Sequence, residues 1–206
     1  MGIVGKTRRL KEAGSDDAAK PPFLAAFVDC ETTGLDPAKH ELIELALVLF
    51  AYEPTTGEVI GIVEEYAGLR EPKGRIHATA REKHGLTCEM VRGKHLDAER
   101  VNSMLDQAAV LIAHNAKFDR AFIGRLFPLA RKKRWYCSMA NIHWTWKGFP
   151  SRGLHSLLAQ HGIKVGQAHR ALNDARATVV LLAQKRDGRT YLAELLGGRR
   201  SVLMQR

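Results

Sequence analysis

The stretch FVDCETTGLD, residues 27–36, places two carboxylates at the end of an apolar run of strand length. The run begins as FLAAFV, which predicts a buried β-strand that ends near Asp29. Because side chains alternate along a strand, Asp29 and Glu31 point to one side and Cys30 points to the other, into the core. Two like charges on one face repel each other, which raises a pKa or requires a cation between them. A turn or a helix cap explains Asp36 better than it explains this pair.

The apolar pattern beyond this strand predicts one α/β domain built around a mixed sheet. Two further strand-like runs, ELIELALVLFAY and EVIGIVEEYAGL, are joined by EPTTG, whose composition suits a hairpin. We therefore expect an antiparallel meander, followed by alternating helices and strands, as in an α/β or α+β sandwich. The predicted strands cover residues 23–29, 41–52, 58–69 and 109–114, and the predicted helices lie near residues 78–86, 97–108, 116–127, 153–161 and 171–186.

A chain of 206 residues with 45% hydrophobic content is long enough for one well-packed domain. Residues 1–22 mix charged and small residues and end in Pro21 and Pro22, which predicts a flexible, basic arm. We place the domain over residues 23–190, and we assign residues 191–206 to the end of a C-terminal helix and a basic tail.

The composition predicts a soluble protein of the cytoplasm. The chain has no apolar run near the roughly 18 residues that a bilayer-spanning helix needs, and its first residues lack the apolar core of a signal peptide. The three cysteines, Cys30, Cys88 and Cys137, contain no Cys-x-x-Cys pair. They therefore favour neither a disulfide framework nor a cysteine-based zinc site.

Positive charge is concentrated in the second part of the chain. Residues 1–116 contain 14 Lys and Arg against 18 Asp and Glu, whereas residues 117–206 contain 18 against 4. A region this basic repels itself unless an anion neutralises it, and nucleic acid is the commonest such partner. A surface that merely favours solubility is the alternative.

Asp119 is predicted to lie on the apolar face of a helix. Phe122, Ile123 and Leu126 follow it at i+3, i+4 and i+7, which is the spacing of one helical face. Burial of an unpaired carboxylate is costly, so Asp119 needs an arginine partner or another cation.

Asp174 is also predicted to face inward. On a helix that begins near Ala171, it shares a face with Thr178 and Leu181. His169 lies just before this helix, where its ring is free to swing. A single histidine is more often structural or exposed than catalytic, but a mobile imidazole with a pKa near neutrality is well suited to accept a proton from water.

Together the four acids predict a site for divalent cations. Four inward carboxylates on three separated elements are hard to neutralise with salt bridges, whereas divalent metal ions neutralise them directly. Oxygen ligands without a thiolate favour Mg²⁺ or Mn²⁺ over zinc. With the basic second part of the chain, the expected chemistry is phosphodiester cleavage with two such metal ions, in which His169 takes the proton of the attacking water.

Three motifs in order make the chain resemble the DEDDh family of 3′-to-5′ exonucleases, which includes the proofreading subunit of bacterial polymerase III. The resemblance spans residues 23–186 and implies a ribonuclease-H-like fold, in which helices flank a five-stranded mixed sheet. The motifs are FVDCETTGLDP with Asp29 and Glu31, LIAHNAKFDRAFI with Asp119, and HRALNDA with His169 and Asp174 in His-x4-Asp spacing.

The resemblance also implies a role for each of these residues. Asp29, Glu31 and Asp174 would bind the first metal ion, and Asp29 would also reach the second. Asp119 would hold the second metal ion, through water. His169 would be the general base.

The resemblance also implies that the residues directly after the first motif bind the terminal nucleotide and its 3′ hydroxyl, where Gly34 would permit a close turn. In the segment RKKRWYCSMANIHWTWKGF, residues 131–149, cations interleave with aromatic residues, which suits binding of a single strand through phosphate contacts and base stacking. We expect either Trp144 or Trp146, but not both, to reach a base. The substrate-binding candidates are Thr32, Thr33, Gly34, Leu35, His114, Asn115, Phe118, Trp144 and Trp146.

These features predict a metal-dependent exonuclease that removes nucleotides from a 3′ end and releases nucleoside 5′-monophosphates, in proofreading or repair. Single-stranded DNA is the favoured substrate, and a polymerase partner is compatible with this function. The alternative is an enzyme that trims RNA 3′ ends or degrades short oligoribonucleotides. A non-catalytic module that binds nucleic acid or a polymerase is a third hypothesis, but such a module has no physical reason to keep mutually repelling carboxylates.

Overall fold

The computed structural model describes residues 23–166 and 168–197, so the predicted arm over 1–22 and the end of the predicted tail lie outside the described residues. Its centre is a five-stranded mixed sheet with the strand order β3-β2-β1-β4-β5. The strands are β1 (Phe23–Thr32), β2 (Leu42–Tyr52), β3 (Val59–Leu69), β4 (Val110–Ala113) and β5 (Arg134–Cys137).

The central strand is β1, which is hydrogen-bonded along both edges. β1, β2 and β3 form the predicted antiparallel meander, and β4 and β5 run parallel to β1. In the pairing of β1 with β2, Asp29 lies opposite Ala46 and Glu31 lies opposite Glu44. The two acids of the first motif are therefore held by the most constrained strand of the sheet.

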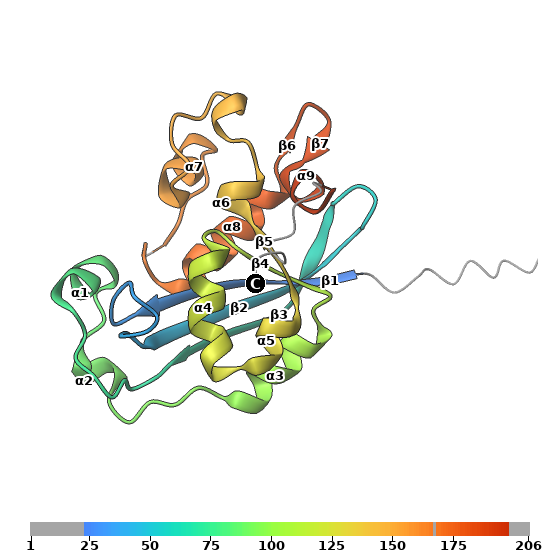
Figure 1. Cartoon of the computed structure of the whole chain (residues 1–206). Coiled ribbons are helices and arrows are strands. Elements are labelled where there is room, and N and C mark those ends of the chain that lie inside the picture. Colours follow the sequence, from blue (N-terminus) through green and yellow to red (C-terminus); the bar gives the residue numbers. More distant parts are fainter. Residues whose placement is uncertain (1–22, 167, 198–206) are drawn as a thin grey trace, which may run out of the picture.

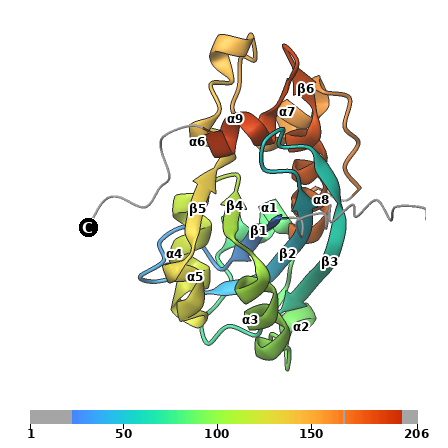
Figure 2. The same cartoon turned by 90° about the vertical axis from the view of Figure 1, so that its right-hand side faces the viewer.

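Helices cover both faces of this sheet (Figures 1 and 2). One face packs against α3 (Ala98–Gln107), α4 (Ala116–Leu126) and α5 (Pro128–Lys132), and the other packs against α8 (Ala171–Ala183), with α7 (Leu154–Gln160) and α9 (Tyr191–Gly197). No described helix is both long and apolar enough to cross a membrane. The remaining elements are α1 (Ala78–His84), α2 (Cys88–Val91), α6 (Ser138–Asn141), the 3₁₀ helix η1 (Thr145–Lys147), and a hairpin of β6 (Lys185–Arg186) and β7 (Arg189–Thr190).

Side chains of β1 alternate between the two cores, as a period of two residues requires. Phe27 packs in the core that contains α8, whereas Val28 and Cys30 pack in the core that contains α3 and α4. Asp29 and Glu31 continue the series of Phe27. They therefore emerge on the α8 side, where the strand ends.

Part of the segment 131–149, in which we predicted contacts with a single strand, packs in the domain core, and its binding to nucleic acid stays a prediction. The segment contains β5, α6 and η1. The indole of Trp135 is fully buried, and its Nε1 donates a hydrogen bond to the carbonyl of Ala130 at 2.8 Å. The strand escaped prediction because it has only four residues and directly follows a basic run.

The C-terminal boundary of the core also differs from the prediction. We placed the end of the domain at residue 190, but α9 packs Tyr191, Leu192 and Leu195 into the core that contains α8. The packed core therefore includes residues beyond 190.

A buried ion pair holds the start of α8 against the sheet. The Glu44 carboxylate of β2 accepts hydrogen bonds from Arg170 Nε and Nη2 at 3.1 and 2.9 Å, and from the N–H of Ala171 at 3.2 Å. The Glu44 side chain is only 4% exposed, so it depends on these donors for neutralisation.

Arg170→Met is expected to lower the free energy of unfolding by about 3 kcal/mol, because it leaves the Glu44 carboxylate buried without its cation. Arg176→Met is the matched control, since Arg176 lies on the same helix but pairs with Glu65 at the surface. That change should lower the free energy of unfolding by less than about 1 kcal/mol. Urea denaturation of the two variants measures both values, and equal losses would contradict this account of α8.

Candidate active site

Four carboxylates converge at the end of β1. Asp29 and Glu31 lie on β1 itself, and Asp174 lies in the first turn of α8. One ligand atom from each of these three residues lies within 4.8 Å of the other two. Asp119, in the first turn of α4, reaches the same strand end from the opposite face of the sheet. The structure therefore brings together acids from the three separated elements that the sequence indicated.

A thiol joins Asp119 to the central strand. The Sγ–H of Cys30 donates a hydrogen bond to Asp119 Oδ1 at 3.3 Å, and both side chains are buried. Cys30 is therefore a core residue, as predicted, and also a contact of the site. On α4, which carries Asp119, Phe122 and Ile123 are buried as expected, whereas Leu126 at the helix end is 37% exposed.

Burial raises the pKa values of all four acids, and repulsion from neighbouring carboxylates adds to the rise for Asp29 and Glu31. Burial raises the pKa of Glu31 to about 8, although the charge of Lys83 opposes the rise. Burial also raises the pKa of Asp119 to about 7. The pKa of Asp29 lies well above its usual range, first because of burial and then because of the nearby charge of Asp119. Burial raises the pKa of Asp174 as well, so the protein alone does not stabilise these carboxylates in their charged form.

His169 faces the carboxylates from the loop before α8. Its φ is 57°, a backbone region that residues other than glycine rarely adopt. The backbone N–H of His169 donates a hydrogen bond to Asp174 Oδ2 at 3.2 Å. Its ring packs edge to face against the ring of His155, with centroids 4.4 Å apart. Burial, followed by the nearby charge of His155, lowers the pKa of His169. The ring is therefore neutral near pH 7 and can accept a proton.

One cavity of about 430 Å³ contains all of these groups. The predicted substrate-binding residue His114 lines it, but both ring nitrogens of His114 are engaged within the protein, with Ser138 Oγ at 2.9 Å and the carbonyl of Arg152 at 2.8 Å. This ring therefore contributes surface rather than hydrogen bonds. The other predicted substrate-binding residues that line the cavity are Thr32, Gly34, Leu35, Asn115 and Phe118.

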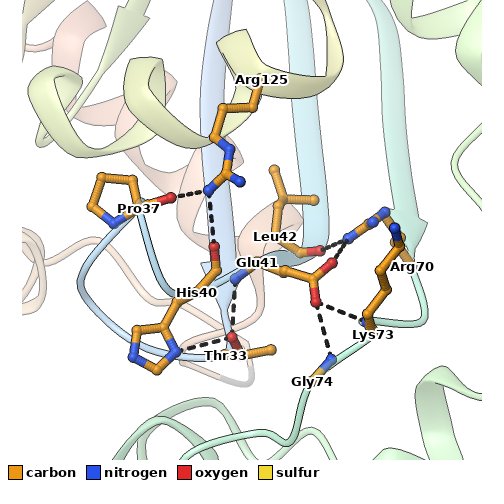
Figure 3. Close-up of polar contacts among 9 residues, drawn as sticks. All are labelled: Thr33, Pro37, His40, Glu41, Leu42, Arg70, Lys73, Gly74 and Arg125. Atoms are coloured by element: carbon orange, nitrogen blue, oxygen red, sulfur yellow. Dashed lines mark hydrogen bonds and ion pairs between the residues drawn. The ribbon is translucent and has the colours of Figure 1, made fainter.

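The loop between β1 and β2, residues 33–41, is anchored on two sides (Figure 3). On one side, Arg125 of α4 donates hydrogen bonds to the carbonyls of Pro37 and His40. On the other, the Glu41 carboxylate accepts hydrogen bonds from the Arg70 guanidinium at 3.0 Å and from the N–H groups of Lys73 and Gly74 at 2.8 and 3.1 Å.

The side chain of Thr33 stabilises this loop and is not part of the cavity wall. Its Oγ1 accepts a hydrogen bond from the N–H of Glu41 at 3.0 Å and lies 3.2 Å from His40 Nδ1. The His40 ring in turn fills the space beside Gly34, where an added Cβ would lie 2.5 Å from His40 Cε1. Gly34 has no positive φ, so glycine here leaves room for the His40 ring, rather than permitting the close turn that we predicted.

Neither of the two candidate tryptophans lines the cavity. Trp144 is fully buried, and its Nε1 donates a hydrogen bond to the carbonyl of Ser138 at 2.7 Å. It cannot stack on a base, so that assignment was wrong. Trp146 is 84% exposed and stacks on the ring of His143. Contact of Trp146 with a base stays a prediction.

The sequence reasoning missed several residues that line the cavity, and two of them, His155 and Lys83, bear on the acids. His155 Nε2 lies 3.4 Å from Asp174 Oδ2, and the charge of Lys83 on α1 opposes the raised pKa of Glu31. A lone histidine among nine carried no signal, because its contact with Asp174 arises only when α7 packs on α8.

The donor set fits divalent cations such as Mg²⁺ or Mn²⁺. Asp174 Oδ1 is buried without a hydrogen-bond partner among the described residues. Within the same part of the chain, no lysine or arginine forms an ion pair with any of the four acids, so an arginine partner for Asp119 is not found. The oxygen atoms of Asp29, Glu31 and Asp174 match the preference of hard cations.

Comparison with known proteins gives related sequences and a related fold. DNA polymerase III PolC-type of Thermotoga maritima is 31% identical over 192 residues, which cover 88% of this chain and 14% of that protein. DNA polymerase III subunit epsilon of Treponema pallidum is 30% identical over 161 residues, which cover 74% of this chain and 72% of the subunit. The chain therefore spans only a small part of the PolC-type relatives.

Among solved structures, E. coli exonuclease I in complex with a dT13 oligonucleotide superimposes with a TM-score of 0.63 at 19% identity, over 77% of this chain and 40% of that chain. This similarity confirms the ribonuclease-H-like fold. The sequence profile of the exonuclease family RNase_T matches residues 26–182. Because this match covers most of the chain and includes all three motifs, the protein belongs to the DnaQ-like, DEDDh family of 3′-to-5′ exonucleases.

Proposed function

We propose that this protein is a metal-dependent exonuclease that removes nucleotides from the 3′ end of single-stranded DNA and releases nucleoside 5′-monophosphates, in proofreading or repair. One observation carries the proposal. Four acids without lysine or arginine partners in the described residues, three of them buried and Asp29 half-buried, share a cavity with the neutral ring of His169. Such an arrangement is costly unless cations bind there.

In the mechanism, Asp29, Glu31 and Asp174 would hold one cation, and Asp29 and Asp119 would hold a second. When bound, the cations stabilise charge on the attacking and leaving oxygens of the phosphodiester. His169 accepts the proton of the attacking water through a ring nitrogen. The hydrogen bond from its backbone N–H to Asp174 keeps this ring beside the carboxylates.

The walls of the cavity support an unpaired 3′ end as substrate. Leu35 is 81% exposed at the cavity, and the half-buried Phe118 of α4 also lines it. Apolar and aromatic surfaces of this kind hold unstacked bases without regard to sequence. The polymerase III relatives support association with a DNA polymerase as a further part of the proposal.

Asp29→Ala is expected to lower exonuclease turnover by at least about 10³-fold, because the acid reaches both proposed cations. His169→Ala is expected to lower it by about 10²- to 10⁴-fold while Mg²⁺ binding is largely kept, since a general base is not a Mg²⁺ ligand. The assay is a time course with 5′-labelled single-stranded DNA, RNA and mismatched duplex, in Mg²⁺ or Mn²⁺. The labelled products should shorten stepwise from the 3′ end.

Asp36→Asn is the matched control, because Asp36 belongs to the same sequence stretch but caps an exposed turn at Ala38 and pairs with Lys39 at the surface. Its activity should equal that of the wild type. Full activity in purified Asp29→Ala would refute the proposed function. Faster cleavage of RNA than of DNA would keep the mechanism but make RNA the substrate.

Glu31→Gln is expected to stabilise the metal-free protein at pH 8 and to leave its stability unchanged at pH 4. Burial raises the pKa of Glu31 from its ordinary 4.5 to about 8, so the folded state holds this proton more tightly than the unfolded chain between these values. Wild-type stability is therefore lost as the pH rises through this window, and the variant avoids the loss.

The expected gain at pH 8 exceeds about 1.4 kcal/mol, the equivalent of one pKa unit. Urea denaturation in EDTA at several pH values measures it, with Glu99→Gln as the control at an exposed acid. A gain that does not depend on pH would contradict the account of the buried charge.

A further inference from the structure

Two histidines and one carboxylate form a second group of ligand atoms beside the acids. One such atom from each of His155, His169 and Asp174 lies within 4.8 Å of the other two. The 3.4 Å between His155 Nε2 and Asp174 Oδ2 is close to the separation of about 3.3 Å expected for two tetrahedral ligands of zinc, each about 2.0–2.1 Å from the metal. The two imidazole rings already meet edge to face.

The two groups of ligand atoms differ in chemistry and share Asp174. Oxygen atoms alone suit Mg²⁺, whereas two imidazoles and one carboxylate suit Zn²⁺. Asp174 Oδ2 lies toward His155 and accepts the hydrogen bond of the His169 N–H, while Asp174 Oδ1 is buried without a partner among the described residues. One carboxylate therefore has an oxygen atom for each group.

We propose that His155, His169 and Asp174 form a Zn²⁺ site whose occupation switches the exonuclease off. Zinc held there takes a ring nitrogen of His169, so this ring no longer accepts the proton of the attacking water. It also takes up Oδ2 of Asp174, which is one of the proposed Mg²⁺ ligands. The effect on hydrolysis rests on the proposed function, whereas the metal site itself does not.

The backbone does not need to rearrange for zinc to bind. His155 is the second residue of α7, and its side chain is 37% exposed. His169 precedes α8, so its ring is not held by the packing of that helix. Both rings also line the open cavity through which a cation would enter.

Zinc binding to the metal-free full chain is measured by calorimetry with ZnCl₂, and the ligand geometry by the visible absorption of Co²⁺ in its place. In His155→Ala and His155→Gln, Zn²⁺ affinity should fall by roughly tenfold or more, and the tetrahedral Co²⁺ bands should disappear. His95→Ala, which removes an exposed histidine, is the matched control and should bind Zn²⁺ like the wild type. Wild-type Zn²⁺ affinity in both His155 variants, or no Zn²⁺ binding to the wild type, would overturn the proposal.

The inhibitory effect is measured as the ratio of rates with and without ZnCl₂ at saturating Mg²⁺, within each variant. The Zn²⁺ concentration for half-inhibition should rise by roughly tenfold or more in His155→Gln, in step with the loss of affinity. Equal inhibition of wild type and variant would overturn the switch. If the chain has no exonuclease activity at all, calorimetry still decides whether the zinc site exists.

Discussion

Repulsion among four carboxylates at the end of β1, three of them buried and Asp29 half-buried, is the constraint on which the rest of the site depends. The sheet places β1 between β2 and β4, and the two acids on this strand are themselves paired with β2, so they cannot move without breaking that pairing. α4 and α8 add one acid each from opposite faces. The nearby buried Glu44 forms an ion pair with Arg170. Among the described residues, none of the four clustered carboxylates has an arginine or lysine partner of this kind. The fold thus neutralises the neighbouring acid and leaves the cluster itself to cations.

Much of this arrangement could be predicted from the sequence, because local periodicity records which way a side chain faces. The three strands of the meander agree with the predictions to within a few residues. Asp174 is buried with Thr178 and Leu181, and Asp119 is buried with Phe122, as helical spacing indicated. The order of the three motifs then predicted that these acids, on separate elements, share one site, which periodicity alone could not predict.

The parts that could not be predicted depend on contacts between distant segments. The hydrogen bond from Cys30 to Asp119 joins residues 89 positions apart in the sequence. A cysteine on a strand does not by itself predict such a bond. The ring of His155 reaches Asp174 only through the packing of α7. Trp144 shows the same limit, because an aromatic residue among cations suits a core and a nucleic-acid surface equally well. Only tertiary packing decides between the two.

The hydrogen bonds of Arg125 have a mechanical consequence for the site. α4 carries Asp119 in its first turn and Arg125 in its last, and Arg125 holds the carbonyls of the loop that begins at Thr33. The loop beside the cavity and one acid of the cluster are therefore anchored by the two ends of a single helix.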